Sequence, residues 1–573
     1  MARANEVVEA LLTEYADLLS ITGGDAFRVR TYEKAARSVG GYHADVATLD
    51  EPGLQAIPNV GGSTAKKIRE MLERGTFRQL DELREQVPAG VRQMMAISTL
   101  GPKKAMSLYK DLRIASIEEL LDAIHDGRLH GVKGFGPKTE ENILRGIELM
   151  QQAGDRVQLG VAMDLAEEIV GELSSLKECT KCTYAGSLRR MAETIGDIDI
   201  LVASREPGPV MEAFANLSYV ERVIARGDTK SSIRTTKGLQ VDLRVIAPEV
   251  WGAALQYFTG SKAHNIRTRE IAVRKGLKLS EYGLFDAETE ELIVAQTEEE
   301  VYERLGLPWI PPALREDRGE IEAARERNLP KLVELKDIKG DLHTHTNLTD
   351  GLAPLEQMIA EARQRRYAYY AVTDHAPNLY MQRMTDEKML AQREQLRKLA
   401  GQGDMVLLHG TELNIDPDGG VDWGPEFLEG FDICVASVHS HFNQSKDEMT
   451  RRIVRACENP HVNVIGHPTG RQIGGRAPLE FDLDEVFAAA ARTGTALEVN
   501  AFPDRLDLRD EHVMWAKRHG VKFAVDTDSH STVHLPFMRY GVGTAQRGWL
   551  TKDDVINAWP LTRLKKFLRK GRR

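Results

Sequence analysis

The sequence predicts a multidomain chain in which an α-helical N-terminal region is followed by an α+β domain and then by an α/β barrel. Three patterns support this. Residues 1–150 carry apolar positions at helical spacing, the segment from about residue 180 reads as strands, and apolar strands ending in polar residues alternate with helices from residue 341 onward. A length of 573 residues is also too great for a single core.

The formal net charge of −10 is unevenly distributed along the chain. Residues 1–280 carry 38 basic and 38 acidic residues, whereas residues 281–340 carry 8 and 16 and residues 341–573 carry 30 and 32. Within the neutral part, residues 61–110 hold 10 basic against 5 acidic residues, and residues 221–280 hold 12 against 5. These two stretches could follow phosphates, so the acidic total does not exclude a nucleic-acid partner.

The chain has neither a run of 18 apolar residues nor a charged-then-apolar leader, which predicts no membrane span and no signal peptide. Its 4 cysteines are too few for a disulfide framework and fit a reducing compartment. We therefore expect a cytoplasmic protein without a membrane partner.

Three short segments in the helical region place a Gly-containing turn before a helix start: Ile57–Ala65, Ile97–Ala105 and Val132–Thr139. At such a turn, free backbone N–H groups and the helix dipole can hold a phosphate. The segments resemble the helix-hairpin-helix element, which grips the DNA backbone without reading sequence. An ordinary helical hairpin is the alternative. The resemblance assigns DNA binding to Val60, Gly61, Lys66, Gly101, Lys103, Lys104, Gly134, Gly136 and Lys138.

Acidic residues mark two of the predicted strands. Asp197 and Asp199 are two residues apart in one strand and so share a face, and the strand 238–245 supplies Asp242. Two carboxylates on one face of an apolar strand are costly unless a cation lies between them. Together the three suit a two-metal site for phosphoryl transfer, with ions roughly 3.5–4 Å apart. Strand-end aspartates facing solvent are the alternative.

Neighbouring motifs carry a family resemblance. Gly186–Ser187 followed by Asp197-x-Asp199 resembles the nucleotidyltransferase palm signature. Tyr257–Asn265 with Arg269 is similar to the nucleotide-binding segment of the family X (DNA polymerase beta-like) DNA polymerases. This resemblance runs from the N-terminus to about residue 318 and implies a palm with fingers and thumb.

The resemblance implies roles for the residues of the polymerase site. Asp197 and Asp199 would bind two Mg²⁺ or Mn²⁺ ions, and Asp242 would bind the catalytic one beside the primer 3′-hydroxyl. Triphosphate, sugar, base and template contacts would come from the nucleotide-binding residues Gly186, Ser187, Arg190, Tyr257, Phe258, Gly260, Lys262, Asn265 and Arg269. Lys262 stands where the family has an acidic residue.

Lys67, in the first hairpin, aligns with the family's lysine that forms a Schiff base during removal of a 5′-deoxyribose phosphate. That chemistry needs an amine with a depressed pKa, to which Lys66 and Arg69 could contribute. The resemblance therefore implies a lyase activity. A phosphate-binding lysine on a basic helix is the alternative.

Histidine is concentrated in the C-terminal part, where 12 of 16 lie between positions 343 and 534. Polar residues at the carboxyl ends of βα units place a site at that face of a barrel. Imidazole mixed with carboxylate suits Zn, Mn or Fe rather than Mg or Ca. The strand ends are Asp341–His345, Val372–His375, His409–Glu412, Val435–His439, Val464–His467, Leu497–Asn500 and Val525–His530.

These strand ends resemble the polymerase and histidinol phosphatase (PHP) domain, a distorted seven-stranded (βα)7 barrel with three metal ions, here Zn²⁺, Mn²⁺ or iron. The metals would activate a hydroxide and neutralise a phosphate. His441 and Arg505 would bind substrate phosphate. We expect His409, His461, His512, His519 and His534 to be structural or surface residues. The implied ligands are His343, His345, Asp350, His375, Glu412, His439, His467, Asp528 and His530.

We expect six segments in the chain. They are a helical lyase-like domain (1–84), a second helical DNA-binding subdomain (85–150), the palm (151–250), a nucleotide-selecting subdomain (251–318), a linker (319–338) and the PHP domain (339–573).

The combined resemblance implies a monomeric DNA polymerase that fills short gaps in base excision repair and takes gapped or nicked DNA and dNTPs. Its PHP domain would act as a 3′-5′ exonuclease, with AP endonuclease or 3′-phosphatase activity also open. Two alternatives remain: a small-molecule phosphatase with a degenerate polymerase, and a DNA-end-binding scaffold. If DNA is bound mainly by the local basic stretches, the affinity should be modest and should fall strongly with salt concentration.

Overall fold

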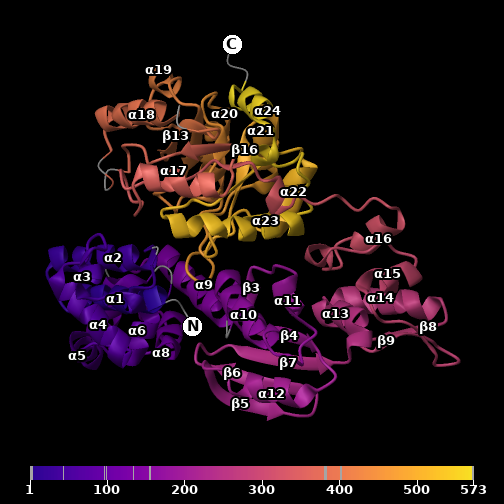
Figure 1. Ribbon diagram of the computed structural model, residues 1–573. Coiled ribbons are helices and arrows are strands. Elements are labelled where there is room, and N and C mark those ends of the chain that lie inside the picture. Colours follow the sequence, from indigo (N-terminus) through magenta and orange to yellow (C-terminus); the bar gives the residue numbers. More distant parts are fainter. Residues whose placement is uncertain are drawn as a thin grey trace.

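The computed structural model describes residues 4–570 apart from 43, 96, 98, 99, 133, 154, 155, 380, 381, 383, 401 and 402, and side chains other than those of 6, 138 and 148–153. Figure 1 shows the N-terminal helices in indigo, the magenta palm and thumb beside them, and the orange-to-yellow barrel above. Within the described part, no helix is long and apolar enough to cross a bilayer.

The N-terminal helices pack around one apolar core that includes Leu12, Tyr15, Ile68 and Phe77. Local signals set several helix ends: the Ser116 side chain caps the helix that follows it by accepting from the Glu119 N–H. The helices are α1 (Ala4–Ile21), α2 (Ala26–Gly40), α3 (Glu51–Gln55), α4 (Gly62–Arg74), α5 (Arg78–Gln86), α6 (Ala89–Met95), α7 (Gly101–Leu112), α8 (Ile117–His125) and α9 (Pro137–Ala153).

The palm is a five-stranded sheet with the order β2-β4-β7-β6-β5. Its central strands β4 and β7 are parallel, and the other neighbours are antiparallel. Helices α10 (Leu159–Ser174) and α12 (Pro207–Ala215) pack against this sheet. The remaining elements are β1 (Val157–Gln158), β2 (Lys181–Tyr184), α11 (Gly186–Arg189), β3 (Thr194–Ile195), β4 (Asp197–Ala203), β5 (Val220–Arg226), β6 (Lys230–Thr235) and β7 (Gln240–Ile246).

The thumb has its own apolar core, which includes Ile271, Tyr302 and Ile310. Residues 319–338, expected as a linker, contain a helix, and Val333 is fully buried in the core of the barrel. The thumb and connecting elements are α13 (Trp251–Thr259), α14 (Lys262–Arg274), β8 (Leu277–Ser280), β9 (Gly283–Asp286), β10 (Leu292–Val294), α15 (Glu298–Arg304) and α16 (Glu320–Arg325).

The C-terminal domain is the predicted seven-stranded parallel sheet, in which each strand pairs with the next along the chain. The strands are β11 (Gly340–Asp341), β12 (Tyr369–Val372), β13 (Val406–Asn414), β14 (Ile433–Ser437), β15 (Val464–Ile465), β16 (Ala496–Asn500) and β17 (Phe523–Asp526). The Leu342 N–H donates to Asp526 Oδ1, and Thr344 bridges to Ser529, so the first and last strands meet and the barrel is nearly closed.

Helices follow the barrel strands on the outside, as a βα repeat requires. They are α17 (Leu355–Gln364), α18 (Asp386–Ala400), α19 (Pro425–Leu428), α20 (Lys446–Glu458), α21 (Leu483–Thr493), α22 (Asp510–Arg518), α23 (Met538–Arg547) and α24 (Leu561–Leu568).

The barrel packs directly on the other domains (Figure 1). Leu506 and Tyr540 of the barrel are buried within the core of the palm. Gly41, after α2, accepts a hydrogen bond from Ser531, and a Cβ at Gly41 would lie 2.0 Å from the Leu352 side chain. The N-terminal helices therefore touch two loops that carry expected metal ligands.

Candidate functional site

Glu412, on β13, is the centre of the barrel site. It is 1 % exposed, and its two carboxylate oxygens lie between 2.9 and 3.6 Å from ring nitrogens of five histidines. Each of these histidines follows a barrel strand, so the carboxyl ends of parallel strands bring them together. They are His343, His345, His375, His439 and His467.

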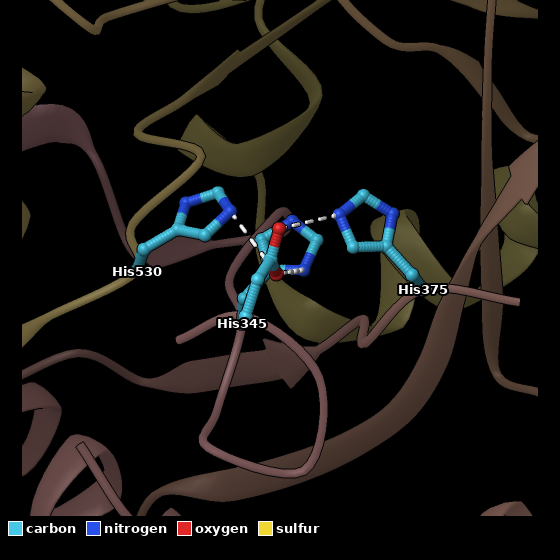
Figure 2. Close-up of side chains that lie close together, drawn as sticks. His345, His375 and His530 are labelled. Carbon is cyan, nitrogen blue, oxygen red and sulfur yellow. Dashed lines mark ion pairs between the residues drawn. The ribbon is translucent and has the colours of Figure 1, made fainter. Parts of the chain in front are cut away.

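A second carboxylate, Asp350, lies within 3.9 Å of three histidine rings, two of them from that group of five. Its oxygens lie 3.3 Å from His530 Nε2 and 3.3 Å from His375 Nε2, and Figure 2 shows these rings and His345 turned toward one carboxylate. Asp528 Oδ1 lies 3.2 Å from His345 Nε2. The structure thus gathers all nine expected ligands in one place. Eight of them form three overlapping groups, and within each group the possible ligand atoms lie within 4.8 Å of one another.

The donor set fits metal ions. Several buried polar atoms of the cluster have no hydrogen-bond partner, including His343 Nε2, both ring nitrogens of His345 and Asp350 Oδ1. Buried polar atoms without partners are costly in a folded protein, and a cation among them removes that cost. Mixed imidazole and carboxylate donors are suited to Zn, Mn or Fe.

The carboxylates and histidines of the cluster stabilise each other's charged forms. Burial alone would raise the pKa of Glu412, but the surrounding histidines hold it well below its ordinary value. Burial opposes protonation of His530, yet Asp350 raises its pKa to about 9. Burial and Arg505 lower the pKa of His467 to about 4, which leaves a neutral imidazole available as a ligand.

Outer residues that the sequence pattern did not single out orient these ligands. Glu498 Oε1 lies 2.7 Å from His343 Nδ1, and Asn414 Oδ1 lies 2.8 Å from His439 Nδ1. Such partners fix the ring orientation and the tautomer of a metal-binding histidine. Glu498 belongs to the strand end Leu497–Asn500, one of the seven already singled out. An acidic residue in that apolar strand end was the sequence signal that could have identified it.

The two expected phosphate contacts differ in setting. Arg505 is one-fifth exposed, its Nε lies 3.8 Å from Asp528 Oδ2, and its buried Nη1 has no hydrogen-bond partner. His441 is exposed and bonded to the hydroxyl of Ser440. Arg505 therefore lies beside the cluster with an unpartnered hydrogen-bond donor, whereas His441 lies on the surface two residues after His439.

The histidines expected outside the site have other contacts. His409 accepts a hydrogen bond from Arg393, and His519 pairs with Asp484. His534 is closer to the centre, because its Nδ1 accepts from the His530 N–H.

The three carboxylates expected at the polymerase site lie on the parallel palm strands β4 and β7. In the parallel register of β4 and β7, Asp199 stands directly opposite Asp242, and Asp197 lies two residues before Asp199 on the same face. Burial and the two neighbouring carboxylates raise the pKa of Asp199 to about 7. A divalent cation would relieve this repulsion. The three carboxylates are spaced more widely than the barrel ligands. Among the described residues, the groups of possible ligand atoms that lie within 4.8 Å of one another are all in the barrel.

Gly186 allows the turn that we expect to bind nucleotide to approach this triad. Its φ is +59°, and a Cβ there would lie 2.3 Å from Asp199 Oδ2. We expect Gly186→Ala to displace the Asp199 carboxylate and slow single-turnover nucleotide incorporation about a hundredfold, the usual consequence of a displacement near 1 Å. Gly208→Ala is the matched control, because Gly208 has open space and no positive φ. Equal rates in the two variants would contradict this role.

Some of the expected nucleotide contacts are already engaged by other protein groups. Tyr257 and Phe258 stack edge to face on α13 with centroids 5.2 Å apart. Asn265 is buried, donates to the Tyr257 carbonyl and accepts from Gln256. Arg269 donates to the Asn265 carbonyl. Contact between Asn265 and a base would therefore require exchange of these hydrogen bonds.

Other members of the set lie at helix ends. Ser187 is half-buried in α11, and Lys262 is the exposed first residue of α14. Gly260 has a φ of +66° beside the guanidinium of Arg190. The Arg190 guanidinium itself pairs with Glu316.

Each of the three Gly-containing turns precedes a helix. Gly61 is the N-cap of α4 after Val60, Gly101 opens α7 with a φ of +56°, and Gly134 (φ +91°) and Gly136 precede α9. Lys66 and Lys103 are exposed, and Lys104 is half-buried. Thr99, Lys133 and the side chain of Lys138 lie outside the described residues.

Lys67 lies on α4 in a defined position. Its Nζ donates to the Ser63 hydroxyl at 3.1 Å and lies 5.6 Å from the centroid of the Tyr32 ring. The structure thus places the amine between the first hairpin and α2.

Comparisons with known proteins agree with this geometry. Family models match for a helix-hairpin-helix domain (residues 3–77), a SAM-like helix-hairpin-helix tandem (91–148), the DNA polymerase beta thumb (254–316) and the PHP domain (341–501). The chain is 36% identical over 565 residues to the DNA polymerase/3′-5′ exonuclease PolX of Bacillus subtilis, covering 98% of each chain.

Two further relatives match separate parts. DNA polymerase lambda of Rattus norvegicus is 24% identical over 323 residues, covering 51% of this chain and 53% of its own. A probable phosphatase of Thermoanaerobacter sp. (strain X514) is 27% identical over 249 residues, covering 41% of this chain and 95% of its own.

Fold and sites together define a two-site enzyme, in which a nucleotidyltransferase palm is joined to a PHP-type phosphoesterase barrel. The chain belongs to the family X DNA polymerases that carry a C-terminal PHP domain.

Proposed function

We propose that this chain fills short gaps in DNA during base excision repair and trims 3′ ends in its barrel. The facing carboxylates Asp199 and Asp242, with Asp197 beside them and the Gly186 turn against them, carry the polymerase part of the proposal. The helix-hairpin-helix turns supply contacts to the DNA backbone that are independent of sequence. A small-molecule phosphatase would need neither feature, and a DNA-end-binding scaffold would need the hairpins but not the facing carboxylates.

In the palm, the chain's own groups hold the reactants. Ser187 and Arg190 bind the incoming triphosphate, and Tyr257 and Phe258 form the wall beside the sugar. The three aspartates would hold two Mg²⁺ or Mn²⁺ ions, which supply charge neutralisation to the attacking and leaving oxygens.

In the barrel, we propose a 3′-5′ exonuclease on the same DNA. Arg505 presents its buried, unpartnered Nη1 beside Asp528 and binds the scissile phosphate together with the exposed His441. The nine ligands would hold three Zn²⁺, Mn²⁺ or iron ions, which lower the pKa of water and neutralise phosphate charge. AP endonuclease and 3′-phosphatase activities use the same phosphate chemistry.

One assay tests both halves. A one-nucleotide gap, labelled at both the primer and the downstream strand, is incubated with Mg²⁺ or Mn²⁺, with and without dNTPs. We expect extension by one nucleotide with dNTPs, shortening from the 3′ end without them, and loss of both after chelation. Lack of incorporation would remove the polymerase proposal, and lack of shortening would remove the exonuclease. Mass photometry of the same sample tests the proposed monomer.

A lyase activity at Lys67 is favoured by the fixed position of its amine between Ser63 and the Tyr32 ring. We expect Lys67→Ala to lose borohydride trapping on an incised abasic substrate, because no other amine would occupy that position. Lys66→Ala, at the exposed neighbour, is expected to keep trapping and lose only DNA affinity. Undiminished trapping in Lys67→Ala would contradict the assignment.

A further inference from the structure

Helix α23 of the barrel lies against the nucleotide-binding turn of the palm. A Cβ at Gly543 would lie 2.6 Å from Met191 Cε and 3.0 Å from Met191 Cβ, so the helix surface is shaped to receive this side chain. Met191 immediately follows Arg190 and has a φ of +57°, a conformation that a non-glycine residue rarely adopts. The end of the turn that begins at Gly186 is therefore held by the barrel domain.

A charge network crosses the same contact. Arg190 Nε donates to Glu316 Oε1 at 3.0 Å, and Arg547 Nη1, at the end of α23, donates to the same oxygen at 2.7 Å. Arg547 also donates to the Arg190 carbonyl at 2.9 Å. On its other side, Arg547 pairs with Asp510 of α22 at 2.9 Å. One barrel residue thus contacts both the backbone of Arg190 and the carboxylate that binds its guanidinium.

These groups are shielded from water, which strengthens their mutual attraction. The side chains of Arg547 and Asp510 are each 9 % exposed, and that of Glu316 is 17 % exposed. Burial opposes ionisation of Glu316, but Arg547 and then Arg190 hold its pKa below the ordinary value. Glu316 is therefore an anion that competes with a triphosphate for Arg190. Arg547 neutralises part of the negative charge of Glu316.

We propose that Arg547 of the PHP domain is a positioning residue for the polymerase site, which keeps Arg190 available to the incoming triphosphate. It does so by balancing the Glu316 carboxylate and by fixing the Arg190 carbonyl. Without Arg547, Glu316 has Arg190 as its nearest cation and holds that guanidinium more tightly. The inference rests on the proposed binding of triphosphate by Arg190.

The test measures single-turnover incorporation into a one-nucleotide gap as a function of dNTP concentration. We expect Arg547→Ala to raise the half-saturating dNTP concentration about tenfold, as when one charge-assisted contact is weakened, with the maximal rate within about twofold. Arg547→Lys should keep part of the affinity. Adding Glu316→Gln to Arg547→Ala should restore it, because the competing carboxylate is gone.

The matched control is Arg539→Ala. Arg539 also lies on α23 and pairs across the same interface, with Glu167 at 2.8 Å and Asp164 at 3.2 Å, but it does not contact the Arg190 turn. We expect it to leave dNTP affinity unchanged. An equal loss in Arg539→Ala, or no rescue by Glu316→Gln, would show that loosening of the interface is the cause and would overturn the inference.

Arg190→Ala separates this inference from the proposed function. If Arg190→Ala raises the half-saturating dNTP concentration and Arg547→Ala does not, only the role of Arg547 is overturned. If Arg190→Ala has wild-type affinity, the triphosphate role fails and the inference with it. Shortening of 3′ ends in the absence of dNTPs should stay at the wild-type rate in Arg547→Ala, because Arg547 lies outside the ligand cluster.

Discussion

Asp242→Ala is expected to abolish gap filling while leaving 3′ shortening intact. Asp242 faces Asp199 across β4 and β7, and the pair needs cations to hold its charges together. Removing one carboxylate should slow single-nucleotide incorporation by about a thousandfold or more, equivalent to about 4 kcal/mol of lost transition-state stabilisation. Rapid-quench incorporation into a one-nucleotide gap measures the effect.

Asp228→Ala serves as the control for this variant, because Asp228 is an exposed aspartate in the turn between β5 and β6 of the same domain. Its incorporation rate should match wild type. Loss of 3′ shortening in Asp242→Ala would show that the two activities share one site, contrary to the division proposed above.

Glu412→Gln should have the opposite effect, removing 3′ shortening and leaving gap filling. An amide of the same shape cannot supply the negative charge that five imidazoles approach. Loss of an outer ligand partner typically costs 10–100-fold, so loss of this central carboxylate should cost at least about a hundredfold. Exonuclease rate and bound metal, the latter by plasma mass spectrometry, should fall together.

Glu429→Gln is the matched control for the barrel, because Glu429 is an exposed glutamate in the same domain. If Glu412→Gln kept both its metal content and its nuclease rate, the cluster would not be the nuclease site. Loss of metal with full nuclease activity would likewise assign the activity elsewhere.

The barrel could be predicted from the sequence because its signals are local. Every ligand except Asp350, which lies in the loop between β11 and α17, lies at or just after an apolar strand. Parallel strands in a βα repeat end at one face, so these ligands could be expected to lie close together. The same holds for Asp197 and Asp199, since strand alternation places them on one face. The predicted fold classes of the helical region and the seven-stranded barrel were confirmed.

The contacts between domains could not be predicted, because no local pattern carries them. Glu316 and Arg547 are separated by 231 residues, and Arg190 lies 126 residues before Glu316. Charged residues at such separations have no sequence signal for pairing. Glu498 was overlooked for a related reason: its role depends on which ring lies across the barrel from it.

The palm core that contains Leu506 and Tyr540 bears on how this protein can be divided or recombined. A truncated chain that ends before the barrel would expose apolar palm side chains to water and would be prone to aggregation. For the same reason, exchanging the barrel for that of a distant relative would require compensating substitutions in the palm. Because two barrel residues complete the palm core, changes to either catalytic half at this contact have to be matched in the other.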